Sequence, residues 1–387
     1  MIKKLVVEKA DRLYHLPSVI DDFLPKRKEK NIIRQDVIDL ARFIWPSTSD
    51  TATARQTTSP SGDLQTQLQS EVALWYKERF GGKIAPGKEI FFGGSIRQII
   101  NLLALVYFNP GDMVFIPDPG IWHYRASAAI SSAETVPYHL LERNHYKPSI
   151  AALSENLARL AKAVFINSPH NPTGQIYNKD DFNELMHMAG RENLLIILDQ
   201  AFEGLTSETH PASIFSQPGG RKVGLELYSF AYNFGQPVPA PAFAIAQPAI
   251  ITGLNNLARI FGITMTPEQL HTGLHAIENK SDIENLKNRF NENRKRMDHL
   301  CQKLRLFPTE YRTGPFYWTK LPGRKQSRRF CRLLYLRCGI LAVPGIAFGE
   351  NGEGFVRFSL TADTESYDKA IEAAQKLFQK KRVKSDG

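Results

Sequence analysis

Apolar and polar residues follow two periods along the chain, one typical of strands and one typical of helices. Short apolar runs bounded by turn-forming residues occur at 89–92, 113–116, 163–166, 194–198, 224–229 and 243–246. Helical spacing of apolar residues marks the segments 64–80 and 96–107. Repeated strand, helix, strand order predicts an α/β fold in which a mostly parallel sheet is sandwiched by helices.

The pattern changes near residue 265. Positions 267–306 have the spacing of a long, highly charged helix, shorter strands follow at 316–321, 341–343 and 355–360, and an amphipathic helix begins near 366. The stretch 47–63 is rich in Ser, Thr, Pro and Gly and is predicted to be a loop. We therefore expect an N-terminal arm and loop at 1–63 that belong to a small domain, a large domain at 64–265, and an interdomain helix with a smaller α+β domain at 266–387.

Composition narrows the class of protein. Hydrophobic residues make up 42% of the 387 positions and charged residues 23%, which is typical of soluble globular proteins. No apolar run is long enough for a membrane helix, and the N-terminus lacks the apolar stretch of a secretory signal, so we expect a cytoplasmic protein without a membrane partner. The odd number of cysteines, without metal-ligand spacing, argues against a disulfide framework or a zinc site.

The net charge of +10 is concentrated in two basic runs, at 324–329 and 380–384. Such runs can contact nucleic acid, but they are more often solvated helix faces and tails. No zinc-finger spacing or RNA-binding aromatic signature accompanies them, so we do not expect a nucleic-acid partner.

Polar residues that follow strands are the candidate site, because ligands of open parallel sheets bind beyond the carboxyl ends of the strands. Gly94 and Ser95 open a helix and offer free N–H groups to a phosphate. The run Asn-Ser-Pro-His-Asn-Pro-Thr-Gly at 167–174 follows another strand, although a proline-fixed turn would explain it too. Asp199 ends a very apolar run, where it either caps a turn or meets a partner that compensates its burial.

These motifs, taken in order, resemble those of fold-type-I aminotransferases of class I/II, which depend on pyridoxal 5'-phosphate (PLP). The run at 167–174 is similar to the family's N-P-H-N-P-T-G, and 199–202 is similar to its D-x-x-Y. The segments 343–349 and 354–359 resemble the family's small-domain signature, so the likeness covers roughly 64–375.

The resemblance implies a role for each matching position. Asp199 would bind the pyridine nitrogen of PLP and keep it protonated, so that the ring acts as an electron sink. Arg357 would grip the α-carboxylate of an amino acid or 2-oxo acid in a bidentate fork. The resemblance also implies a homodimer. The remaining cofactor-binding candidates are Gly94, Ser95, Trp122, Asn171 and Ser229.

The chain departs from this family where the family's cofactor lysine lies, in a segment like S-F-S-K-T-Y-N-x-x-G-x-R-x-G. Aligned without gaps, Tyr232 replaces the lysine and Ala240 replaces the phosphate-binding arginine. A shifted alignment does not restore the lysine, because none occurs between Lys222 and Lys280. The lysine amine captures PLP as an imine and moves a proton. A phenol cannot form that bond, although a lowered pKa would leave it as a general base.

Two further positions differ from the family pattern. The aromatic residue that stacks on the PLP ring falls at Ile121, with Trp122 next to it, and the tyrosine of D-x-x-Y is Phe202.

Several functions therefore stay open, and with them the question whether the protein is an enzyme. We favour a catalytically degenerate homologue with a binding or regulatory role. The main alternative holds PLP, pyridoxamine phosphate or a PLP–amino acid adduct non-covalently and uses Tyr232 or His123 as base. The others are an ordinary aminotransferase with a sequence error near residue 231, and a basic nucleic-acid-binding protein on a borrowed fold.

Overall fold

The computed structural model describes residues 20–24, 37–45, 61–148, 159–207, 212–237, 240–310, 313–323 and 326–379. Four predicted segments lie wholly or partly outside these residues: most of the N-terminal arm, the loop positions 47–60, part of the basic run at 324–329 and the whole run at 380–384. The last positions of the predicted loop are helical instead, because α2 (Ser61–Phe80) begins at Ser61 and carries Asp63 in its first turn.

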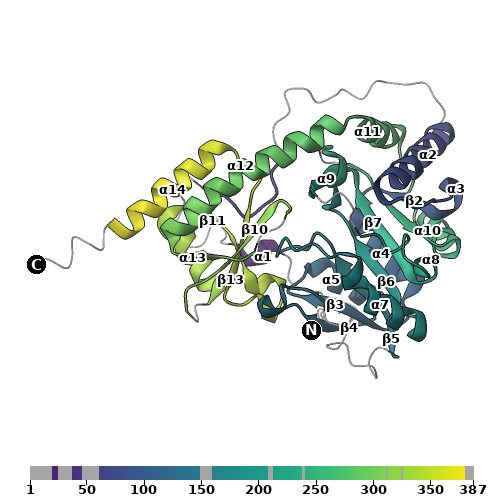
Figure 1. Ribbon diagram of the computed structural model, residues 1–387, viewed down its shortest axis with the longest axis horizontal. Helices are drawn as coiled ribbons and strands as arrows, with labels where there is room; N and C mark the ends of the chain where they lie inside the picture. Colours follow the sequence, from purple (N-terminus) through teal and green to yellow (C-terminus); the bar gives the residue numbers. More distant parts are fainter. Residues whose placement is uncertain are drawn as a thin grey trace, which may run out of the picture.

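A seven-stranded sheet forms the centre of the larger part of the molecule (Figure 1). Only β8 runs opposite to its neighbours, so the predicted mostly parallel sheet is confirmed. Its inner strands are almost wholly buried, which explains their continuous apolar runs. In spatial order the strands are β2 (Ile90–Gly93), β8 (Ala242–Ala246), β7 (Gly224–Ser229), β6 (Leu195–Asp199), β5 (Ala161–Asn167), β3 (Met113–Asp118) and β4 (Glu134–His139).

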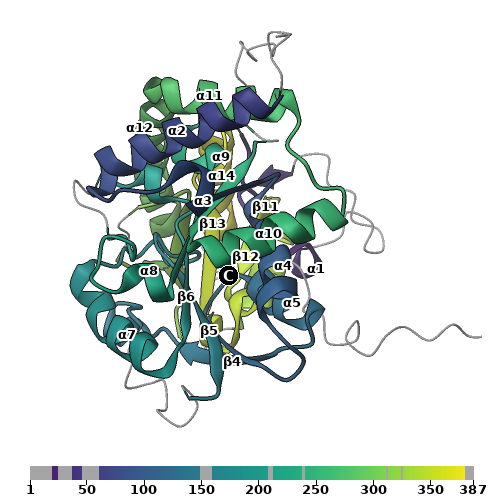
Figure 2. The ribbon, with the colours of Figure 1, turned by 90° about the vertical axis from the view of Figure 1, so that its right-hand side faces the viewer.

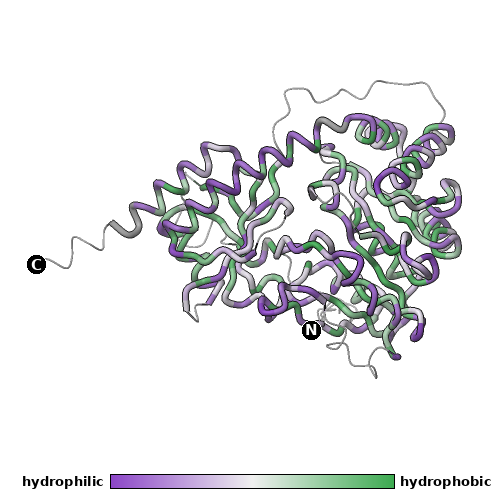
Figure 3. Tube along the Cα trace, viewed as in Figure 1, coloured by the Kyte–Doolittle hydropathy of each residue, from purple (hydrophilic) through white to green (hydrophobic). Residues whose placement is uncertain are grey.

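Helices cover both faces of this sheet (Figure 2). On one face lie α4 (Ile96–Tyr107), α5 (Trp122–Ile130) and α10 (Pro248–Ile260), and on the other α7 (Lys179–Glu192) and α8 (Gly220–Val223). The helix α2 packs against α11 (Pro267–Glu278). Apolar residues gather along the strands and polar ones on the outer helix faces (Figure 3), and no helix of the described chain is long and apolar enough to cross a membrane.

The C-terminal part builds a second, antiparallel sheet of β12 (Val343–Pro344), β13 (Phe355–Ser359), β10 (Phe316–Lys320) and β9 (Phe307–Pro308). Beside it β1 (Ile38–Asp39) pairs with β11 (Ile340–Leu341). The helices α13 (Ser327–Cys338) and α14 (Thr364–Gln379) pack here. The single helix predicted at 267–306 is instead divided at Asn279 into α11 and the long α12 (Lys280–Leu304). The predicted domain limits stay a prediction.

Candidate functional site

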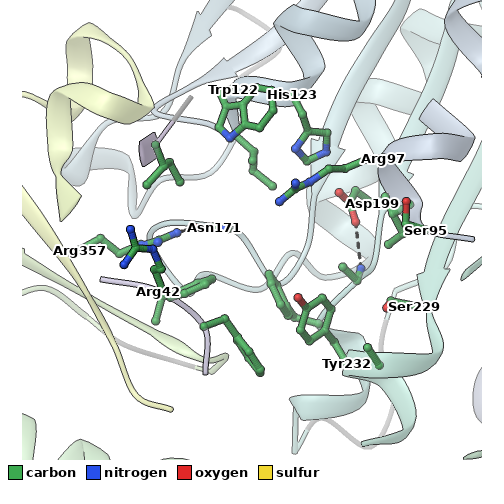
Figure 4. A pocket seen from close by; sticks show the side chains of 18 of the residues that line it. Arg42, Ser95, Arg97, Trp122, His123, Asn171, Asp199, Ser229, Tyr232 and Arg357 are labelled. Atoms are coloured by element: carbon green, nitrogen blue, oxygen red, sulfur yellow. Dashed lines mark hydrogen bonds between the residues drawn. The ribbon is translucent and has the colours of Figure 1, made fainter. Parts of the chain in front are cut away.

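The site is a pocket of about 500 Å³ that opens at the carboxyl ends of the central strands. Side chains from the second sheet close its other side, so the two sheets contribute opposite walls (Figure 4). Every predicted site residue except Gly94 lines it: Ser95, Trp122, Asn171, Asp199, Ser229, Tyr232 and Arg357. The N–H of Gly94 is bound by the side-chain oxygen of Gln98 at 2.8 Å, so Gly94 is not part of the wall.

Asp199 ends β6 and is only 1% exposed. Its Oδ2 accepts a hydrogen bond from the Tyr124 hydroxyl at 2.7 Å, and its Oδ1 accepts one from the Ala201 N–H at 3.0 Å. No cation of the described chain forms an ion pair with this carboxylate. Burial raises the pKa of Asp199 to about 6, because the charged form is poorly solvated there.

Tyr124 is a site residue that sequence reasoning missed. It lies on α5, and its ring stacks on Phe165 with the ring centroids 4.5 Å apart and the planes 14° from parallel. This packing aims the hydroxyl at Asp199, so Tyr124 acts as a positioning residue for the carboxylate. The two residues are 75 positions apart, and only its nearness to Trp122 hinted at a role.

Arg357 reaches the pocket from β13 and is 3% exposed. Its Nη1 donates to Asn171 Oδ1 at 3.1 Å and its Nη2 to the Ala41 carbonyl at 3.0 Å, whereas Nε has no partner in the described chain. The guanidinium carbon lies 3.8 Å from the ring centroid of Phe316. No described carboxylate pairs with it. Burial lowers its pKa to about 9, so it stays protonated at neutral pH.

The loop after β5 holds Asn171 in the pocket wall and explains the unusual run at 167–174. The Asn171 N–H donates to Asn167 Oδ1 at 2.7 Å, and Asn167 Nδ2 donates to the Asp199 carbonyl at 2.9 Å. The ends of β5 and β6 are thereby tied together, and Asn171 lies beside Arg357 (Figure 4).

Ser229 ends β7 and is held in a similar way. Its N–H donates to Asn233 Oδ1 at 2.8 Å, and Asn233 Nδ2 donates to the Gln200 carbonyl at 3.0 Å. These bonds fix the turn that leads into the short helix α9 (Phe230–Phe234), which carries Tyr232.

The Tyr232 ring lies among aromatic side chains. Its centroid is 5.7 Å from that of Trp45, to which it stacks, and 5.0 Å from those of Phe43 and Phe202. Burial raises the pKa of Tyr232, which is opposite to the lowered pKa that a general base at this position would need.

His123, the other base considered, also lines the pocket. Burial, together with the charge of Arg97, lowers its pKa to about 3, so the imidazole is neutral and weakly basic. Its Nε2 is buried and has no hydrogen-bond partner within the described residues.

The site combines three features: a mostly parallel seven-stranded sheet, Asp199 at the end of an inner strand, and the buried Arg357 from a second sheet. Together they indicate the class of fold-type-I, PLP-dependent aminotransferases. Residues 37–373 match the family model described as aminotransferase class I and II, and the chain belongs to this family. The LL-diaminopimelate aminotransferase of Halothermothrix orenii is 29% identical over 388 residues, covering 95% of this chain and 97% of that protein.

Solved structures agree with this assignment. Substrate-bound BacF from Bacillus subtilis matches with a TM-score of 0.82 and 25% identity over 88% of this chain and 90% of its own. The aspartate aminotransferase of Thermotoga maritima shares the fold, with a TM-score of 0.81 and 20% identity over 96% of this chain and all (100%) of its own.

Proposed function

We propose that the pocket binds a PLP-type ligand non-covalently between Asp199 and Arg357, and that the protein does not transaminate through an imine-forming lysine. The ligand would be pyridoxamine phosphate or an adduct of PLP with an amino acid. The observation that carries this proposal is the pair of buried, oppositely charged side chains, neither of which has an ionic partner in the described chain.

An unpaired buried charge is costly, typically by several kcal/mol, unless a partner of opposite charge or good hydrogen-bonding geometry compensates it. Asp199 and Arg357 each keep hydrogen bonds to neutral groups only. A ligand that brings a cationic N–H donor to Asp199 and an anionic carboxylate to Arg357 would compensate both. A protonated pyridine ring linked to an amino acid has these two features.

The residues of the wall fit such a ligand in its non-covalent form. Asp199, aligned by Tyr124, would accept the pyridine N–H, and Arg357 would hold the carboxylate beside Asn171. Trp122 and Phe202 offer apolar surface to a flat ring. A bound PLP-type cofactor supplies an electron sink to the amino acid that it carries.

The same wall lacks the groups that transamination needs. None of the described residues that line the pocket is a lysine. Tyr232 stays protonated because burial raises its pKa, and His123 is a weak base. A residue that could move the proton at Cα efficiently at neutral pH is therefore missing from the described wall, which favours a binding or regulatory role over turnover.

Calorimetric titration with two ligands tests the proposal: pyridoxamine phosphate, and the stable reduced adduct phosphopyridoxyl-alanine, which adds a carboxylate. We expect both to bind, the adduct more tightly. Asp199→Asn should weaken both by about tenfold or more, because a charged hydrogen bond contributes roughly 1.5–3 kcal/mol. Arg357→Gln should remove the advantage of the adduct and leave pyridoxamine phosphate binding nearly unchanged.

Arg42→Gln is the matched control, because Arg42 also lines the pocket but its Nη1 pairs with Asp39 at 2.8 Å. It should change neither affinity. Failure of both ligands to bind the unaltered protein at millimolar concentration would refute the proposal.

A further inference from the structure

Four aromatic side chains line the pocket next to one another: Phe43, Phe202, Tyr232 and Phe316. The ring centroids of successive neighbours are 5.0 Å apart for Phe43 and Tyr232, 5.0 Å for Tyr232 and Phe202, 5.9 Å for Phe202 and Phe316, and 6.5 Å for Phe316 and Phe43. Neighbouring planes are inclined by between 55° and 87°, close to the edge-to-face geometry that aromatic pairs prefer. We call these four residues the aromatic wall.

The aromatic wall is supported from behind, which keeps its rings at the cavity. Trp45 does not line the pocket, and its ring centroid lies 5.0 Å from that of Phe43 and 5.7 Å from that of Tyr232. Phe43 and Tyr232 are themselves only half-buried, and Figure 4 shows the Tyr232 ring projecting into the pocket. Part of the apolar surface of the wall is therefore free to contact a ligand.

The aromatic wall begins beside the group that would hold the carboxylate. The guanidinium carbon of Arg357 lies 3.8 Å from the ring centroid of Phe316. In an amino acid the side chain and the carboxylate are bonded to the same carbon, so a side chain whose carboxylate binds Arg357 starts beside Phe316. Phe202 also borders the pyridine ring in the proposed complex, and Tyr232 stands where the family lysine would be. Phe43 and Phe316 are therefore the members left to contact the side chain.

The charges around the pocket decide which side chain fits this wall. None of its four members is charged, and the Tyr232 hydroxyl is its one polar side-chain group. Among the described residues that line the pocket, Asp199 is the only carboxylate, and the pyridine N–H would occupy it. An ammonium or amide group laid on the wall would lose its hydrogen bonds to water for at most one hydroxyl partner. An aromatic ring instead gains apolar contact and edge-to-face stacking.

We propose that the aromatic wall is the side-chain subsite of this pocket, and that the amino acid of the bound adduct carries an aromatic or large apolar side chain. This assignment rests on the proposed function, because the carboxylate of the adduct places the side chain. The pocket volume of about 500 Å³ is within the range of pockets that bind drug-sized ligands, so it has room for an aromatic side chain beside the pyridine ring.

Calorimetric titration with three reduced adducts tests the subsite: phosphopyridoxyl-alanine, phosphopyridoxyl-phenylalanine and phosphopyridoxyl-glutamine. The glutamine side chain has a similar reach to that of phenylalanine but ends in an amide, so it separates size from apolar contact. We expect the unaltered protein to bind the phenylalanine adduct about tenfold more tightly than the alanine adduct, because an aromatic ring is removed from water. The glutamine adduct should bind no more tightly than the alanine adduct.

Substitution of Phe43 tests whether this preference arises at the aromatic wall. Phe43→Ala should lower the preference by about tenfold and leave the affinity for the alanine adduct nearly unchanged, because Asp199 and Arg357 are retained. Phe43→Leu keeps apolar volume and should retain only part of the preference. Ile44→Ala is the matched control, because Ile44 is the next residue, is 42% exposed and does not line the pocket. It should change neither affinity.

The alanine adduct separates failure of the subsite from failure of the proposed function. If it binds, the subsite is overturned by a phenylalanine adduct that binds no more tightly, by a glutamine adduct that binds as tightly as the phenylalanine adduct, or by a preference that survives in Phe43→Ala. If Phe43→Ala binds neither adduct, Phe43→Leu replaces it, and a preference equal to that of the unaltered protein overturns the subsite. If the unaltered protein binds no adduct at millimolar concentration, the proposed function fails, and the subsite fails with it.

Discussion

Ionisation of Asp199 should control binding, because its carboxylate forms a charge-assisted hydrogen bond with a protonated pyridine N–H, which is much stronger than the bond that a neutral carboxyl group would accept. Burial raises its pKa to about 6, so the carboxylate is present above this pH and is lost as the pH falls through it. Affinity for pyridoxamine should therefore decrease below about pH 6, approaching tenfold per pH unit. In the protein without ligand, ionisation of Asp199 should lower the free energy of unfolding above this pH, because burial disfavours the charged carboxylate.

Calorimetric titration between about pH 5 and pH 8 measures this dependence. Pyridoxamine is the suitable ligand, because the second ionisation of a phosphate monoester also lies near pH 6 and would overlap. Asp199→Asn should bind weakly at every pH in this range, without the inflection. An affinity of the unaltered protein that does not fall in acid would exclude Asp199 as the acceptor.

For individual residues, the sequence predicted members of the pocket wall where a residue belongs to a motif. Asn171, Asp199 and Arg357 lie in ordered motifs, and all three line the pocket. Tyr124 was missed because its contact with Asp199 depends on side-chain direction across the pocket, which no spacing along the chain encodes. Gly94 was assigned to the site from its turn alone, but Gln98 already occupies its N–H.

Among the elements, the contact between α9 and the short 3₁₀ helix η4 (Glu203–Leu205) positions Tyr232 and Ser229. A Cβ atom on Gly204 would lie 2.1 Å from the Asn233 carbonyl oxygen, which is backbone and cannot turn away. We expect Gly204→Ala to lower the free energy of unfolding by roughly 1–3 kcal/mol and to weaken ligand binding, because α9 must shift. Urea denaturation and calorimetric titration measure the two effects.

Gly190→Ala in α7 is the control, since a Cβ there meets nothing within 4 Å. This change should be neutral or stabilising, by up to about 1 kcal/mol, because alanine favours the helix. Equal effects of the two substitutions would show that the contact between η4 and α9 does not constrain the fold.

The strands that the sequence predicted are those with continuous apolar runs, because both of their faces are buried. The edge strand β4 was missed, since it keeps largely exposed, polar positions and a proline. The helix predicted at 267–306 is interrupted at Asn279, whose side chain donates to the His275 carbonyl at 2.8 Å. Helical spacing continues across this break, so periodicity alone could not reveal it.

For the whole molecule, the pocket depends on two sheets that are far apart in sequence. The end of β3 is joined to the C-terminal part by Asn351, whose N–H donates to Asp118 Oδ1 at 3.1 Å and whose Nδ2 donates to Asp118 Oδ2 at 3.0 Å. The family motifs made the fold predictable. That Asp199 and Arg357 line one pocket, each without an ionic partner in the described chain, could be recognised only in three dimensions. The homodimer and the cytoplasmic location stay predictions.

The central claim is that this pocket holds its ligand without a covalent bond because Tyr232 stands where a lysine would be. Incubation with PLP, borohydride reduction and peptide mapping of the unaltered protein and Tyr232→Lys test it most directly. In Tyr232→Lys we predict a stoichiometric adduct at position 232, which pyridoxamine phosphate prevents by competition. In the unaltered protein we predict no lysine adduct with these two properties. A competable, stoichiometric adduct on any lysine of the unaltered protein would contradict the account.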